Sequence, residues 1–225
     1  MCLLLVGTLT TAAQAKDPVR AQHAMVVAQE PLAADVGRRV LMDGGNAVDA
    51  AVAIGLALAV THPSAGNLGG GGFMLVRLAN GKTAFLDFRE AAPAKSDRDM
   101  YLDADGNPTK DSIFGWRSSG TPGSVAGFDF AHKKFGSKPW AELVAPALKL
   151  ARDGFGVSQT LAESFTASQK MLAADPESKR IFLRDGAPYK TGEVFKQPEL
   201  ANTLDRIAKG GAQEFYQGET AHRLA

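Results

Sequence analysis

The sequence predicts an α+β fold, in which helices and antiparallel strands form layers. Apolar residues recur at helical spacing in several segments, and two short apolar runs flank Asn80-Gly81 in the manner of a β-hairpin. The chain has 225 residues, of which 45% are hydrophobic, and it has no long polar tract. It can therefore bury a substantial core and should form one compact domain, or a large part of one.

Two helices are predicted first. Residues 31–42 have helical periodicity and end at Asp43-Gly44-Gly45, where glycine can adopt the left-handed conformation of a helix cap. Asn46 should cap a second helix from Ala47 to about Val60. Because this helix is apolar on nearly every face except at Asp49, we expect it to be buried, and it is too short to span a bilayer comfortably.

A β-hairpin is predicted after the glycine run Gly69–Gly72. The apolar patterns of 73–78 and 84–88 indicate two strands, and Asn80-Gly81 indicates a two-residue type I′ turn, which needs positive φ at both positions. The four glycines fit neither phosphate-binding pattern, because no lysine follows at the required spacing and the run precedes a strand instead of opening a helix. They should instead let the backbone approach a ligand or a neighbouring strand.

The hairpin presents Arg89 at the end of its second strand. A guanidinium held there can bind a carboxylate through two parallel hydrogen bonds, which lysine cannot do. This arrangement points to an anionic small-molecule substrate. The alternative is that Arg89 only pairs with Asp87 or Glu90 at the surface, and the local sequence leaves both interpretations open.

The rest of the chain is predicted to be mostly helical after a polar, turn-rich segment at 95–116. Further helices are expected from the Gly120–Gly127 segment through Phe135, at 140–153, at 157–174 and at 198–209. Asp103–Pro108 resembles a calcium loop only weakly, since its glycine stands at the fourth position and Phe114 replaces the final glutamate. We expect a surface turn there.

Charge and motif content exclude several classes of function. The formal net charge of +1 gives no broad cationic field for nucleic acid. The chain has no His-x-x-x-His pair, no Gly-x-Ser-x-Gly elbow and one cysteine, Cys2, so we expect neither a metal nor a cofactor. The four histidines are His23, His62, His132 and His222. His62 and the nearby Ser64 are expected to have core or surface roles.

Residues 1–15 are predicted to be an export signal. An apolar run from Cys2 to Leu9 precedes Ala13-x-Ala15, which matches the small-residue rule for signal-peptidase cleavage. The usual positively charged start is missing, so a mature N-terminal strand is the competing interpretation. We expect cleavage before Lys16 and a secreted or periplasmic protein without a membrane span.

Several motifs in the same order resemble the large-subunit portion of the γ-glutamyltransferases (γ-glutamyltranspeptidases, glutathione hydrolases). They are Met25–Ala28, Gly44–Ala53, Gly69–Met74, Asp87–Pro93, Gly120–Gly127, Gln197–Leu204 and Phe215–Gly218. The resemblance covers nearly all of residues 16–225. Several independent motifs in the correct order are harder to obtain by chance than one glycine loop.

This resemblance implies an N-terminal-nucleophile hydrolase with an αββα sandwich, made as a precursor that cuts itself into a large and a small subunit. The new N-terminal threonine of the small subunit would be the nucleophile, with its own α-amine as base. We expect this threonine to lie beyond Ala225, so that the chain alone is inactive and has no catalytic residue of its own. Arg89 would hold the α-carboxylate of a γ-glutamyl donor such as glutathione, whose acyl group passes to water or an amino acid.

Two alternatives stay open. The chain could belong to a cephalosporin or glutaryl acylase of the same superfamily, whose substrate also carries a carboxylate. It could also be a non-catalytic binding module or fragment, because it contains no evident nucleophile.

Overall fold

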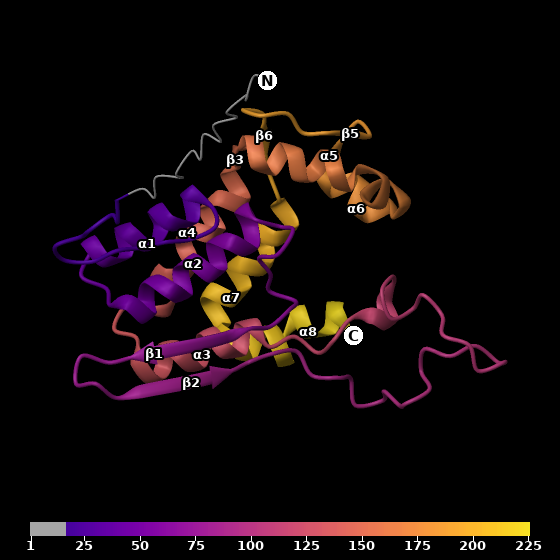
Figure 1. Ribbon diagram of the computed structural model, residues 1–225, viewed down its shortest axis with the longest axis horizontal. Coiled ribbons are helices and arrows are strands. Elements are labelled where there is room, and N and C mark those ends of the chain that lie inside the picture. The colour runs from indigo at the N-terminus through magenta and orange to yellow at the C-terminus, as the bar shows by residue number, and fades with distance from the viewer. Residues whose placement is uncertain (1–16) are drawn as a thin grey trace, which may run out of the picture.

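The computed structural model describes residues 17–225, so the predicted export signal lies outside the described residues. The chain mixes helices and strands, as the sequence predicts (Figure 1). A group of helices lies on one side and a long β-hairpin backed by one helix lies on the other. An extended segment between the hairpin and that helix reaches away from both (Figure 1).

Four helices form the main core. They are α1 (Pro31–Met42), α2 (Ala47–Thr61), α4 (Trp140–Asp153) and α7 (Pro198–Gln217). Helix α2 packs against both α1 and α4, and α4 packs against α7. Leu56, Leu143 and Leu204 of these helices are 0–1% exposed. The predicted burial of the second helix is confirmed.

Local caps fix the end of α1 and the start of α2 as predicted. Gly44, just past α1, has a φ of 84°. The Asn46 side chain accepts hydrogen bonds from the backbone N–H groups of Val48 and Asp49, and the Asp49 carboxylate accepts one from Asn46 N–H at 2.8 Å. This reciprocal arrangement is a capping box.

The hairpin consists of β1 (Phe73–Arg77) and β2 (Thr83–Asp87), paired antiparallel with Leu75 opposite Phe85. Its inner face places Val76 and Leu86 in the core, and β2 packs against α3 (Ser124–Phe135). The outer face is apolar and solvent-exposed at Phe73, Leu75 and Phe85.

The predicted type I′ turn is wrong. Gly81 has a φ of 84°, but among the described residues Asp185 is the only non-glycine residue with positive φ, so Asn80 does not adopt the left-handed conformation. Gly81 N–H donates to Leu78 O, and Leu78 N–H donates to Lys82 O. This pattern is a three-residue loop in which an ordinary turn is followed by a left-handed glycine.

Smaller elements lie between α4 and α7. They are β3 (Phe155–Gly156), α5 (Gln159–Ala174), α6 (Pro176–Phe182), β4 (Leu183–Arg184), β5 (Ala187–Pro188) and β6 (Val194–Phe195). Helix α5 starts two residues later than predicted because Ser158 serves as its cap and accepts a hydrogen bond from Leu161 N–H. An aromatic cluster around Phe165 and Phe195 joins this region to the core.

Helix α7 extends beyond its predicted end at Lys209. It breaks at Gly211, whose φ of 63° and ψ of −155° are non-helical, and then resumes as far as Gln217. Helix α8 (Glu219–Leu224) follows, and the short helix η1 (Trp116–Ser118) lies in the extended segment before α3.

Candidate functional site

The glycine run before β1 is tied to the first turn of α3. The Asn67 side-chain oxygen accepts hydrogen bonds from Gly70 N–H at 2.9 Å and from the Ser124 hydroxyl at 2.7 Å. Gly70 O in turn accepts from Gly123 N–H at 2.7 Å and Ser124 N–H at 2.9 Å. Segments separated by more than 50 residues are thus fixed side by side.

Two glycines then allow the backbone around Arg89 to pass very close to this pair of segments. A Cβ atom added at Gly123 would lie 2.0 Å from Phe88 O, and one added at Gly71 would lie 2.6 Å from Glu90 N. Neither position tolerates a side chain without a backbone shift. Of the two roles predicted for the glycine run, close approach of a neighbouring backbone is the one seen at Gly71.

Arg89 follows directly after the last residue of the hairpin whose backbone is paired, Phe88. Phe88 and Gly72 exchange two backbone hydrogen bonds, and Ala91 pairs with Thr121 in an isolated antiparallel bridge. The backbone is therefore held on both sides of Arg89. The predicted position of this residue at the end of the second strand is confirmed.

The Arg89 side chain is exposed and lines an open groove of about 550 Å³. The groove, called the Arg89 groove below, is also lined by Glu90, Pro93, Tyr101, Ser119 and Gly120. Arg89 N–H donates to the Asp87 carboxylate at 3.1 Å, but within residues 17–225 the guanidinium pairs with neither Asp87 nor Glu90. It is thus available to an anionic ligand.

The histidines and Ser64 make contacts that are typical of structural residues. His132 Nε2 lies 2.7 Å from Lys138 O, and no histidine ring in the described part of the chain hydrogen-bonds a serine or threonine hydroxyl. His62 caps the end of α2, and Ser64 lines a small apolar cavity beside Phe165.

Residues 17–225 contain no evident metal site and no helix suited to crossing a membrane. Across residues 17–225, no group of three or more His, Cys, Asp or Glu side chains is placed to hold a metal ion. The Asp103 carboxylate accepts hydrogen bonds from the backbone N–H groups of Asp105 and Asn107, each at 2.9 Å, as in a surface turn. None of the described helices is both long and apolar enough to cross a membrane.

Sequence reasoning missed two residues that organise this region. Asn67 connects the glycine run to α3, and Tyr216, at the end of α7, reaches the loop before α3. Asn67 lies just before the motif Gly69–Met74 and Tyr216 lies within the motif Phe215–Gly218, but their roles depend on partners 57 and 94 positions away in the sequence. Sequence spacing gives no signal for such contacts.

Comparisons with known proteins agree with the resemblance in the motifs. A family model described as Gamma-glutamyltranspeptidase matches residues 33–225. The Glutathione hydrolase proenzyme of Escherichia coli (strain K12) is 52% identical over 210 residues, which cover 92% of this chain and 36% of the relative. The chain thus spans about a third of the length of this curated relative.

Solved structures give the same result. The Helicobacter pylori gamma-glutamyltranspeptidase structure matches with a TM-score of 0.89 and 44% identity, over 92% of this chain and 60% of that one. The cephalosporin acylase from Bacillus halodurans matches with a TM-score of 0.78 and 26% identity, over 96% of this chain and 42% of that one. These relatives are N-terminal-nucleophile hydrolases, which confirms the predicted fold class.

Proposed function

Because the chain belongs to the gamma-glutamyltranspeptidase family, we propose that it is the large-subunit portion of an enzyme that cleaves γ-glutamyl amide bonds. Its donors would be glutathione and related γ-glutamyl compounds. The acyl group would pass to water or to an amino acid. The observation that carries the proposal is the unpaired guanidinium of Arg89 at the rim of a groove, on backbone held from both sides.

In this proposal Arg89 orients the donor and does not take part in bond cleavage. A planar guanidinium forms two parallel hydrogen bonds to the α-carboxylate of the γ-glutamyl group, which fixes both the position and the direction of the substrate. The extended side chain of the donor would then place its γ-carbonyl carbon at the nucleophile. No residue of this chain attacks that carbon.

The nucleophile would be the N-terminal threonine of a small subunit from the same precursor, formed by autocatalytic cleavage. Its hydroxyl oxygen would bond to the γ-carbonyl carbon, and its own α-amine would take the hydroxyl proton. The amide bond breaks, the leaving amine takes up a proton, and an acyl-enzyme is formed. Water or an amino acid then releases the acyl group.

The outer face of the hairpin supports a partner of this kind. Phe73 is 56% exposed, Leu75 is 75% exposed and Phe85 is 64% exposed, and the first and last of these rings stack on each other. Contiguous exposed apolar side chains commonly mark an interface. We propose that the small subunit covers this face as the second sheet of the αββα sandwich.

The cellular location is also a proposal. An export signal at residues 1–15 would direct the protein to the periplasm or the exterior, and cleavage before Lys16 would remove Cys2.

The test compares two donors on the complete gene product. We expect γ-glutamyl-p-nitroanilide to be cleaved with a kcat/KM at least about tenfold above that of glutaryl-p-nitroanilide, which lacks the α-amine. A clear preference for the glutaryl compound would contradict the proposal and favour the acylase, whose structural match is weaker in identity, at 26%. No turnover of either donor would favour a non-catalytic protein.

A further inference from the structure

The hydroxyl of Tyr216 bridges a backbone group of the loop that leads into α3 and one in the first turn of α3. It donates to Pro122 O at 2.9 Å and accepts from Ala126 N–H at 3.2 Å. Burial raises the pKa of the Tyr216 hydroxyl above its ordinary value, although the hydrogen bond from Ala126 works against this shift. The hydroxyl therefore keeps the proton that it donates to Pro122.

The loop held by Tyr216 is the one that supports the backbone of Arg89. Thr121, directly before Pro122, exchanges hydrogen bonds of 2.8 and 3.2 Å with Ala91. Gly123, directly after Pro122, donates to Gly70 O at 2.7 Å and packs against the carbonyl of Phe88. A shift of Pro122 would therefore move the supports on both sides of Arg89.

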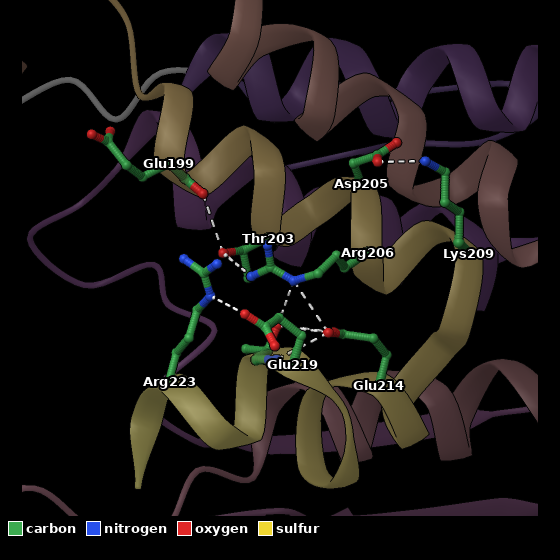
Figure 2. Close-up of polar contacts among 9 residues, drawn as sticks. Glu199, Thr203, Asp205, Arg206, Lys209, Glu214, Glu219 and Arg223 are labelled. Carbon is green, nitrogen blue, oxygen red and sulfur yellow. Dashed lines mark hydrogen bonds and ion pairs between the residues drawn. The ribbon is translucent and has the colours of Figure 1, made fainter.

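Tyr216 lies in the last part of α7, and a network of polar side chains fixes the direction of this part of the helix. This part follows the break at Gly211, and Figure 2 shows Arg206, from before the break, reaching Glu214 beyond it. Arg206 Nε lies 3.2 Å from the Glu214 carboxylate and 3.0 Å from the Thr220 hydroxyl.

This network differs from the other ion pairs around it. The side chains of Arg206 and Glu214 are only 24% and 15% exposed, whereas those of Arg223 and Glu219 nearby are 67% and 54% exposed. Water screens a partly buried pair less than an exposed one. The Arg206–Glu214 pair, with Thr220 and the buried ring of Phe215, therefore fixes the orientation of Tyr216.

We propose that Tyr216 is a positioning residue for the donor site, acting through the Pro122 loop on the backbone that carries Arg89. The inference rests on the proposed role of Arg89. In this role Arg89 holds the donor carboxylate equally in the ground state and the transition state, so loss of positioning should weaken donor binding and leave the chemical step intact.

The experiment uses the complete, mature gene product with γ-glutamyl-p-nitroanilide as donor. Tyr216→Phe keeps the ring but removes the hydroxyl, and we expect KM to rise about five- to tenfold while kcat changes by less than about twofold. Tyr189→Phe is the matched control, because it removes a hydroxyl from the separate aromatic cluster around Phe165 and Phe195. Its KM should equal that of the unaltered enzyme.

A double variant separates positioning from a general structural effect. If Tyr216 acts through Arg89, Tyr216→Phe should change KM much less in the Arg89→Lys background, because the group being positioned has already been altered. An equal fold-change in both backgrounds would overturn the inference. Should Tyr216→Phe block maturation, Thr220→Val loosens the same network, and an unchanged KM in that variant would likewise overturn it.

The two proposals fail in different ways. An unchanged KM in Tyr216→Phe, together with a raised KM in Arg89→Lys, would refute only the role of Tyr216. An unchanged KM in Arg89→Lys would refute the proposed role of Arg89 itself.

Discussion

At the scale of single residues, Arg89 stands apart from the arginines closest to it in the extended segment. Arg98 pairs with Asp99 at 3.0 Å, and Arg117 pairs with Asp111 at 3.1 Å. Both pairs are solvent-exposed, so they contribute little to stability. Arg89 has acidic neighbours in sequence but uses only its backbone N–H toward Asp87. Its guanidinium therefore remains available for a carboxylate from outside the chain.

We predict that Arg89→Lys in the complete enzyme raises KM for γ-glutamyl donors about tenfold or more, or about 1.4 kcal/mol. Lysine keeps the positive charge but cannot form the two parallel hydrogen bonds. Initial rates over a range of donor concentrations give the value. Arg77→Lys, an exposed arginine on β1, is the control. A KM like that of the unaltered enzyme would contradict the role of Arg89.

At the scale of elements, Asp49 connects α2 to the turn between α3 and α4. The residue is fully buried, and its carboxylate accepts hydrogen bonds from the Ser137 hydroxyl at 2.6 Å and Ser137 N–H at 2.9 Å. Burial alone would raise the pKa of this carboxyl, but the hydrogen bonds that it accepts outweigh burial and hold the pKa below its ordinary value of 3.8. The ionised form thus stabilises the helical core.

The lowered pKa of Asp49 makes the stability of the folded protein depend on pH. A carboxyl with a lowered pKa in the folded state contributes stability that is fully present above pH 3.8 and is lost as the pH falls through the folded pKa. We predict that Asp49→Asn lowers the free energy of unfolding by about 1–3 kcal/mol at pH 7, and that the difference shrinks below pH 3.8.

Urea unfolding of the complete gene product at pH 7, 5 and 3 measures this difference. Asp105→Asn, in an exposed turn, is the control and should change the unfolding free energy little at any pH. If Asp49→Asn lowers the free energy of unfolding by the same amount at all three pH values, the proposed contribution of the ionised Asp49 carboxylate is contradicted.

Elements that are determined by neighbouring residues could be predicted from the sequence. Elements that depend on contacts with residues far away in the sequence could not. Helices α1 and α2 were predictable because their caps at Asn46 and Gly44 lie next to their apolar runs. The turn type was missed because the identity of Asn80 does not determine its φ. The continuation of α7 past Gly211 was missed because it depends on Arg206 reaching Glu214 across the break.

At the scale of the whole molecule, the proposed donor site is built from separate parts of the chain. Three segments far apart in sequence, around Gly70, Arg89 and Gly123, meet through backbone hydrogen bonds and close glycine contacts. Arg89 itself could be singled out from the hairpin pattern, but the groove that it lines could not, because the groove forms only when these segments meet. The groove and the apolar outer face of the hairpin both remain open to solvent in the described residues.

The most direct test is a crystal structure of the complete protein with bound L-glutamate, the product of donor hydrolysis. We predict that both terminal nitrogens of the Arg89 guanidinium lie about 2.7–3.2 Å from the two oxygens of the α-carboxylate. An α-carboxylate held by other groups, with Arg89 turned toward solvent, would contradict the account.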